Sequence, residues 1–129
     1  SNVYSLIAIN FANPDMVGHT GNIPAAVKAC QATDDCVGKI VHLALSLGGA
    51  AVITADHGNV EEMVDPGGEM DTEHSLFPVP LIIADSRYEH RPHLLPRGKL
   101  GDVAPTILSM LGFPVPKVMT GKNLLADIT

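Results

Sequence analysis

Three short stretches of the chain are apolar almost throughout and do not alternate between apolar and polar residues. They run from Val3 to Ile9, from Ala50 to Ala55 and from Val79 to Ala84, and each leads into polar, proline or glycine residues. A strand covered on both faces shows such a continuous pattern, whereas a strand with one wet face alternates. The pattern therefore predicts three short strands buried between helices.

Between the first two stretches, apolar residues recur at steps of three and four from Ile23 to Leu47. This spacing predicts a long amphipathic helix, and the pair Gly48-Gly49 is a typical stop signal for its C-terminus. A strand, a helix and a strand in this order favour a parallel strand pair with a right-handed crossover. The polar face of the predicted helix carries Lys28, Asp35 and Lys39.

A second, shorter helix is predicted from Asp102, a good N-cap residue, to the stop signal at Gly112. The fold class is therefore α/β, with a mostly parallel sheet flanked by helices. Three strands are few for such a sheet, and Ser1-Asn2 resembles a remnant of cloning. We expect the chain to begin inside a larger protein and, because a partial sheet exposes an edge and apolar faces, to self-associate.

Composition narrows the class of protein. Hydrophobic residues make up 46% of the 129 residues but aromatic residues only 4%, which suits an aliphatic core and not a stacking platform for bases. Eight basic against fourteen acidic residues give a formal net charge of −6, which argues against a nucleic-acid surface. The sequence shows no apolar run of about 20 residues, so no membrane partner is expected. Cys30 and Cys36 lie too far apart along a helix for a disulfide, which favours free thiols in the cytoplasm.

Acidic and histidine side chains gather where an α/β sheet usually carries its functional groups, just beyond the ends of the strands. Asp15 and His19 follow the first predicted strand, and their i,i+4 spacing lets them face one ion. Asp56 and His57 directly follow the second strand, and His74 precedes the third. An N-cap at Asp15 and a plain turn at Asp56 are the alternatives for each pair alone. Together the five favour a metal site, for which Mn, Zn, Fe or Co would suit.

The other histidine and charged residues are expected to have ordinary surface roles. His42 lies within the long predicted helix and is interpreted as a surface or packing residue. The acidic stretch from Glu61 to Glu73 is predicted to be a mobile, exposed loop. A basic loop is interpreted as solvated charge, with phosphate contact as the alternative. Its residues are Arg87, His90, Arg91, His93, Arg97 and Lys99.

Around the candidate ligands, the sequence closely resembles the 2,3-bisphosphoglycerate-independent phosphoglycerate mutases, which belong to the alkaline phosphatase superfamily. The resemblance covers nearly the whole chain. Its longest motif reads Asn-Phe-Ala-Asn-Pro-Asp-Met-Val-Gly-His-Thr-Gly-Asn and is specific to this family. One departure is Phe77, where the family usually carries an asparagine. The matching stretches are Asn10 to Asn22, Thr54 to Asn59, Asp102 to Thr106 and Met119 to Lys122.

The resemblance implies a metal-dependent isomerase of glycolysis that interconverts 3- and 2-phosphoglycerate through a phosphoserine, without 2,3-bisphosphoglycerate. It implies two divalent ions, manganese first, with zinc, cobalt or magnesium as alternatives. Asp15, His19 and His74 would hold the first ion, and Asp56 and His57 would contribute to the second.

The resemblance also implies parts that residues 3–129 lack: the nucleophilic serine, a further aspartate ligand and the substrate-binding transferase domain. The chain would then be the C-terminal segment of the phosphatase domain and inactive alone, whereas the full enzyme would be a monomer. Thr20, Thr54 and Ser75 are expected to support the ligand geometry and not to attack phosphorus. Three alternatives stay open: a phosphopentomutase or phosphodiesterase of the same superfamily, a non-catalytic metal-binding or regulatory module, and a structural protein without metal.

Overall fold

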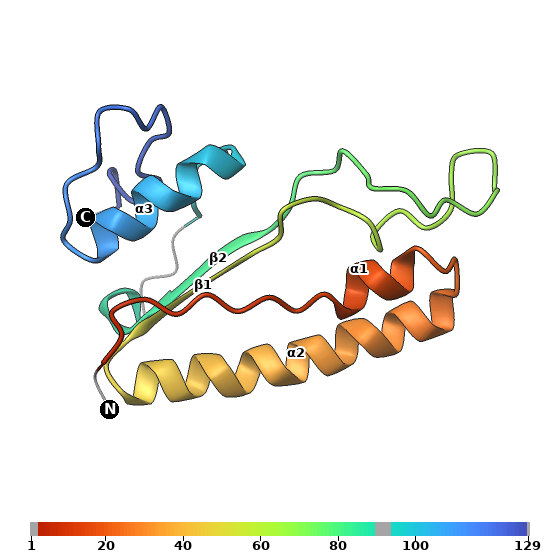
Figure 1. The fold of residues 1–129 in the computed structure, drawn as a ribbon, viewed down its shortest axis with the longest axis horizontal. Coiled ribbons are helices and arrows are strands. Elements are labelled where there is room, and N and C mark those ends of the chain that lie inside the picture. Colours follow the sequence, from red (N-terminus) through yellow and green to blue (C-terminus); the bar gives the residue numbers. More distant parts are fainter. Residues whose placement is uncertain (1–2, 90–93, 129) are drawn as a thin grey trace. The chain divides into compact units, whose positions relative to one another are not determined.

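The computed structural model describes residues 3–89 and 94–128, which form two compact units. The larger unit comprises Ala8–Ser86, and the smaller one combines the residues up to Ile7 with Arg87–Thr129. Helices and strands are both present, so the α/β class is confirmed in its coarse form (Figure 1). In the larger unit the helices are α1 (Asn13–Gly18) and α2 (Ile23–Ser46), and the strands are β1 (Ala50–Thr54) and β2 (Leu81–Asp85).

Helix α2 matches the predicted helix and ends one residue earlier. The side chain of Asn22 accepts a hydrogen bond from the backbone N–H of Ala25 at 3.0 Å, which satisfies one of the free donors of the first turn. At the other end Gly48 has a φ of 73°, and the N–H of Gly49 returns to the carbonyl of Ala44 at 2.8 Å. This glycine-dependent turn ends the helix as predicted. Cys30 and Cys36 are free.

The sheet differs from the prediction. Strands β1 and β2 are antiparallel, with Ala50 opposite Asp85 and Thr54 opposite Leu81. The prediction of a mostly parallel sheet was therefore wrong. The reason lies in the connection: a parallel pair needs a crossover, usually through a helix, and among the described residues between β1 and β2 there is no helix. The predicted strand from Val3 to Ile9 is also absent, and its large apolar side chains are exposed.

The smaller unit contains a short 3-10 helix, η2 (Leu100–Asp102), and helix α3 (Val103–Met110). Asp102 occupies the predicted N-cap position of α3, but its side chain makes no capping hydrogen bond to that helix. Instead its carboxylate accepts hydrogen bonds at 2.9 Å from the backbone N–H groups of Lys99 and Lys122. It is 2% exposed. Asp102 therefore ties the segment around Lys122 to the start of α3.

Two further predictions concern features outside the core. His42 is exposed on α2, and its ring nitrogen Nδ1 lies 3.0 Å from the carbonyl of Gly38, as expected for a surface residue. His90, Arg91 and His93 of the predicted basic loop lie outside the described residues. Among the helices that the structure describes, none combines the length and the apolar character needed to cross a membrane.

Candidate metal centre

The antiparallel pairing brings together two loops that carry candidate ligands. Because Thr54 faces Leu81, the segment that leaves β1 and the segment that enters β2 lie at the same end of the sheet. The N–H of Ser75 donates to the carbonyl of Gly58 at 2.8 Å and joins these segments. The rings of His57 and His74 stack next to this link, with centroids 3.7 Å apart and planes 18° from parallel.

Helix α1 contributes two more candidate ligands. The predicted helical turn is present, with a proline in its first turn. Asp15 lies within α1 and His19 is its C-cap residue, whose backbone N–H donates to the carbonyl of Asp15. Their side chains face each other as the i,i+4 spacing predicts, with His19 Nε2 3.2 Å from Asp15 Oδ1.

Three candidate ligand atoms lie close to one another and form a small triangle. His74 Nε2 lies 3.3 Å from Asp15 Oδ1 and 3.2 Å from His19 Nε2, and the third side of this triangle is the 3.2 Å between His19 and Asp15. A tetrahedral ion with bonds of about 2.0–2.1 Å holds its ligand atoms roughly 3.3 Å apart. The triangle therefore has the size that a small divalent cation needs.

The backbone sets the tautomer of His19. Its Nδ1 lies 2.6 Å from the carbonyl oxygen of Thr72, which can only accept, so Nδ1 carries the proton. In a neutral ring, Nε2 then presents a lone pair to the Asp15 carboxylate. Either a metal ion or a second ring proton between these two atoms would make their contact attractive. A backbone carbonyl behind a histidine ligand is a common device for aiming its other nitrogen at a metal.

His57 lies close to Asp15 and His74 and belongs to the same cluster of candidate ligands, whereas Asp56 lies at the edge of this cluster. One ligand atom each from Asp15, His57 and His74 lies within 4.8 Å of the others. The side chain of Asp56 is 88% exposed, and its Oδ1 lies 3.6 Å from His57 Nε2. All five candidate ligands therefore belong to the larger unit and lie at one end of its sheet. The division into two ion sites stays a prediction.

Two residues near the cluster were not singled out by the sequence. Asn59 is 6% exposed, and its side-chain Nδ2 donates to Asp15 Oδ1 at 3.2 Å. Glu61 accepts a hydrogen bond from the backbone N–H of Asn59 at 2.8 Å and another from the Ser75 hydroxyl. For Asn59, the sequence offers one indication of a role at the site, its position directly after Asp56, His57 and Gly58. The acidic stretch predicts an exposed loop, and Glu61 is exposed, but the composition of the stretch gives no hint of these contacts.

Hydrogen bonds lower the pKa of the Glu61 carboxyl. Desolvation by the surrounding loop raises the pKa of its carboxyl. The hydrogen bonds from Ser75, from its own backbone and from Asn59, together with the nearby His57, outweigh this effect and hold the pKa below the ordinary value of 4.5. Glu61 is therefore an anion at neutral pH and acts only as an acceptor.

The other acidic residues of the predicted loop are only partly as expected, since Glu69 and Glu73 are exposed but Glu62, Asp65 and Asp71 are half-buried. Some of them are also hydrogen-bonded. Asp65 accepts from the N–H of Glu69 at 2.8 Å, and Asp71 accepts from that of Glu73 at 2.9 Å. Val64 and Met70 form an isolated β-bridge.

The predicted supporting hydroxyls have different surroundings. Thr20 Oγ1 donates to the carbonyl of Val17 at the end of α1, and Ser75 contacts Glu61. Thr54 lies 3.4 Å from the carbonyl of Ala55, at the limit of a hydrogen bond. Phe77, the departure from the family pattern, is exposed, and its N–H donates to Ser75 Oγ at 3.3 Å.

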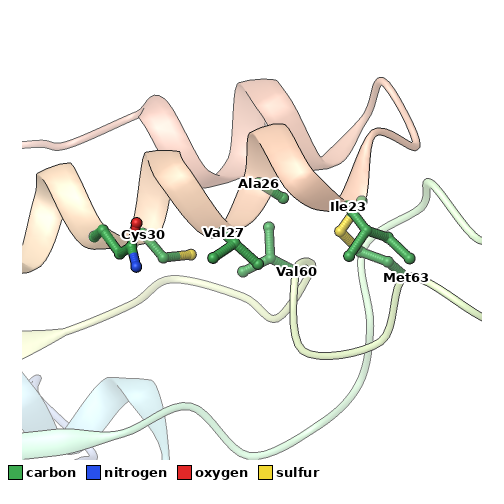
Figure 2. A pocket seen from close by; sticks show the side chains of 7 residues that line it. Ile23, Ala26, Val27, Cys30, Val60 and Met63 are labelled. Carbon is green, nitrogen blue, oxygen red and sulfur yellow. The ribbon is translucent and has the colours of Figure 1, made fainter.

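An apolar cavity of about 230 Å³ lies beside the cluster, between α2 and the loop after β1. Figure 2 shows Val60 and Met63 of this loop facing the side chains of α2. Met63 is buried. The cavity contains none of the candidate ligands, and its walls anchor the segment that carries Asn59 and Glu61. Its lining residues are Ile23, Ala26, Val27, Cys30, Gln31, Val60 and Met63.

Carboxylate and imidazole groups that converge in this way could hold a metal ion, and comparison with known families points to the same class of protein. Residues 1–115 match the metalloenzyme superfamily, and the chain belongs to that superfamily. Within it, the chain is homologous to a segment of the 2,3-bisphosphoglycerate-independent phosphoglycerate mutases.

The similarity to these relatives is high but covers only part of them. The chain is 52% identical over 124 residues to the mutase of Clostridioides difficile and 53% identical over 128 residues to that of Lawsonia intracellularis. It is also similar to a crystal structure of Leishmania mexicana phosphoglycerate mutase at low cobalt concentration, with a TM-score of 0.76 and 30% identity. These matches cover 95%, 98% and 95% of this chain, but only 24%, 24% and 25% of the respective relatives. The chain thus spans about a quarter of the length of the relatives it matches.

Proposed function

We propose that this chain provides divalent-metal ligands to a phosphoglycerate mutase that interconverts 3- and 2-phosphoglycerate through a phosphoserine, without 2,3-bisphosphoglycerate. The observation that carries the proposal is the triangle of Asp15 Oδ1, His19 Nε2 and His74 Nε2, with sides of 3.2–3.3 Å. The identity with mutases that bear this name supports the choice of reaction.

Each ligand has a distinct part in the proposal. Asp15, His19 and His74 hold one ion, and Asp56 and His57 contribute to a second. Manganese is the first expectation for both, with zinc, cobalt or magnesium as alternatives. When bound, such ions stabilise the negative charge of a transferring phosphoryl group and lower the pKa of an attacking hydroxyl. They would also offset the acidic character of a chain with a formal net charge of −6.

The chain's own groups prepare the site for this chemistry. The carbonyl of Thr72 keeps the proton of His19 on Nδ1 and leaves Nε2 free to bind. The stack of His57 on His74 places two imidazoles beside the Asp15 carboxylate. In this proposal the serine nucleophile and the groups that grip phosphoglycerate lie outside the 129 residues. Residues 3–129 then act as the C-terminal part of a phosphatase domain.

A chimera tests the proposed function. This chain would replace the matching segment of the Clostridioides difficile relative, and the purified chimera would be assayed for conversion of 3- to 2-phosphoglycerate with manganese. We expect activity, which His74→Ala abolishes and His42→Ala leaves intact. A folded chimera without mutase activity, or one that prefers a pentose phosphate, would contradict the proposal.

A further inference from the structure

A second layer of polar contacts surrounds the candidate metal centre. The buried Asn59 donates through Nδ2 to Asp15 Oδ1, the same oxygen that forms the ligand triangle. A carboxylate can only accept, so this contact fixes which end of the amide faces Asp15. A carboxylate oxygen has two lone pairs, so Asn59 occupies one and leaves the other for an ion. This contact fixes the direction in which Asp15 presents its free lone pair.

Glu61 connects the two loops that carry the histidines. One of its oxygens accepts from the backbone N–H of Asn59, and the other accepts from the hydroxyl of Ser75, the residue after His74. Together with the Ser75–Gly58 backbone bond, this anion fastens the loop of His57 to the loop of His74. Both histidines are thereby held by a group that does not itself belong to the ligand cluster.

Two glycines leave room for this network. A Cβ at Gly18 would overlap the side-chain oxygen of Asn59 and would lie 2.9 Å from Val60 Cγ1. A Cβ at Gly58 would overlap the carboxylate of Glu61 and the hydroxyl of Ser75. Both glycines are buried. The absence of a side chain at both positions gives the buried Asn59 and the carboxylate of Glu61 room to make these contacts.

From these contacts we propose that Asn59 and Glu61 are positioning residues of the metal centre. Asn59 orients Asp15, and Glu61 sets the separation of the loops that bear His57 and His74. The inference rests on the proposed function, because it assumes that the cluster binds an ion. Its physical basis is preorganisation: ligands already held in place lose less conformational freedom when the ion binds.

The test uses the 129-residue chain and manganese. Asn59→Leu keeps the volume of the side chain but removes its donor, and Glu61→Gln keeps its shape but removes its charge. We expect each change to weaken Mn²⁺ binding by about 10- to 100-fold in a calorimetric titration. The neighbouring Glu62→Gln serves as the matched control and should bind like the wild type. Circular dichroism verifies that every variant is folded.

A second measurement separates positioning from a general loss of stability. At saturating Co²⁺, the visible absorption of the bound ion reports its ligand geometry. We expect Asn59→Leu to change this spectrum, whereas a variant that is merely less stable would keep it. A wild-type chain that binds no ion would overturn both the proposed function and this inference. If the wild type binds and both folded variants match it in affinity and spectrum, only the inference is overturned.

Discussion

Individual side chains in both units are held by backbone groups from distant parts of the sequence. His19 is oriented by the carbonyl of Thr72, and Asp102 accepts from the N–H of Lys122. The hydrogen bonds from Lys122 and then Lys99, against the opposing effect of desolvation, hold the pKa of Asp102 below its ordinary value of 3.8. The charged form of Asp102 therefore stabilises the smaller unit.

The pH dependence of stability tests this role of Asp102. Its pKa is lower in the folded chain than in the unfolded chain, so its contribution is complete above the ordinary value of 3.8 and is lost as the pH falls through the folded pKa. We expect Asp102→Asn to lower the melting temperature by several degrees at neutral pH, and this difference to shrink in acid. Thermal denaturation across pH measures it. The exposed Asp34→Asn should cause no such change, and a constant difference at all pH values would contradict the assignment.

The sequence predicts which side chains come together better than it predicts what holds them. Asp15, His19, His57 and His74 were selected because their residue types and their spacing are visible in the chain. Thr72 was not, since it contributes a carbonyl that every residue possesses. Glu61 is exposed, as its place in the acidic stretch predicts, and only its contacts with Asn59 and Ser75 distinguish it from the other acidic residues there.

At the scale of elements, α2 shows how local signals determine an element without help from its neighbours. Its periodicity, its Asn22 cap and the glycine turn at Gly48 agree with one another. Gly38 and Gly48 are a natural comparison, because a Cβ at either position meets no atom within 4 Å. They differ in backbone conformation, since only Gly48 has a positive φ, of 73°.

This pair predicts opposite effects of the same substitution. Gly48→Ala should destabilise the chain by about 1 kcal/mol, because a Cβ disfavours the left-handed conformation. Gly38→Ala should stabilise it by about 0.5–1 kcal/mol, because alanine loses less entropy within a helix. Urea denaturation gives both free energies of unfolding. Equal effects of the two changes would show that the turn at Gly48 does not restrict the backbone as described.

The strands were less predictable than the helices because a strand depends on partners that its own sequence does not name. The stretches that became β1 and β2 and the stretch from Val3 to Ile9 have similar composition, yet only β1 and β2 pair. The predicted direction of strand pairing was also wrong. The candidate ligands nevertheless lie at one edge of the sheet, because an antiparallel pair also places the end of β1 beside the start of β2.

For the whole molecule, the exposed apolar surface is the dominant feature. Leu76 and Leu94 are almost completely exposed, and so is most of Val118. Each strand of the two-stranded sheet has one edge without a strand partner among the described residues. Surfaces of this kind usually form interfaces.

The predicted self-association follows from this surface. We expect sedimentation velocity to show species larger than a monomer whose share rises with protein concentration, because burying exposed aliphatic side chains is favourable. Salt should not disperse them, since screening weakens charge pairs and not apolar contacts. A single monomeric species at every concentration would contradict this prediction.

Asp15, His19 and His74 are proposed to bind one divalent ion, and calorimetric titration of the 129-residue chain with Mn²⁺ measures this binding. We predict one bound ion for the wild type and for His42→Ala, which alters a histidine of α2 outside the cluster. His19→Ala and His74→Ala should each weaken binding by roughly tenfold or more, since each removes one of the three candidate ligands. A wild-type chain that binds no Mn²⁺, or equal affinities among the three histidine variants, would contradict the claim.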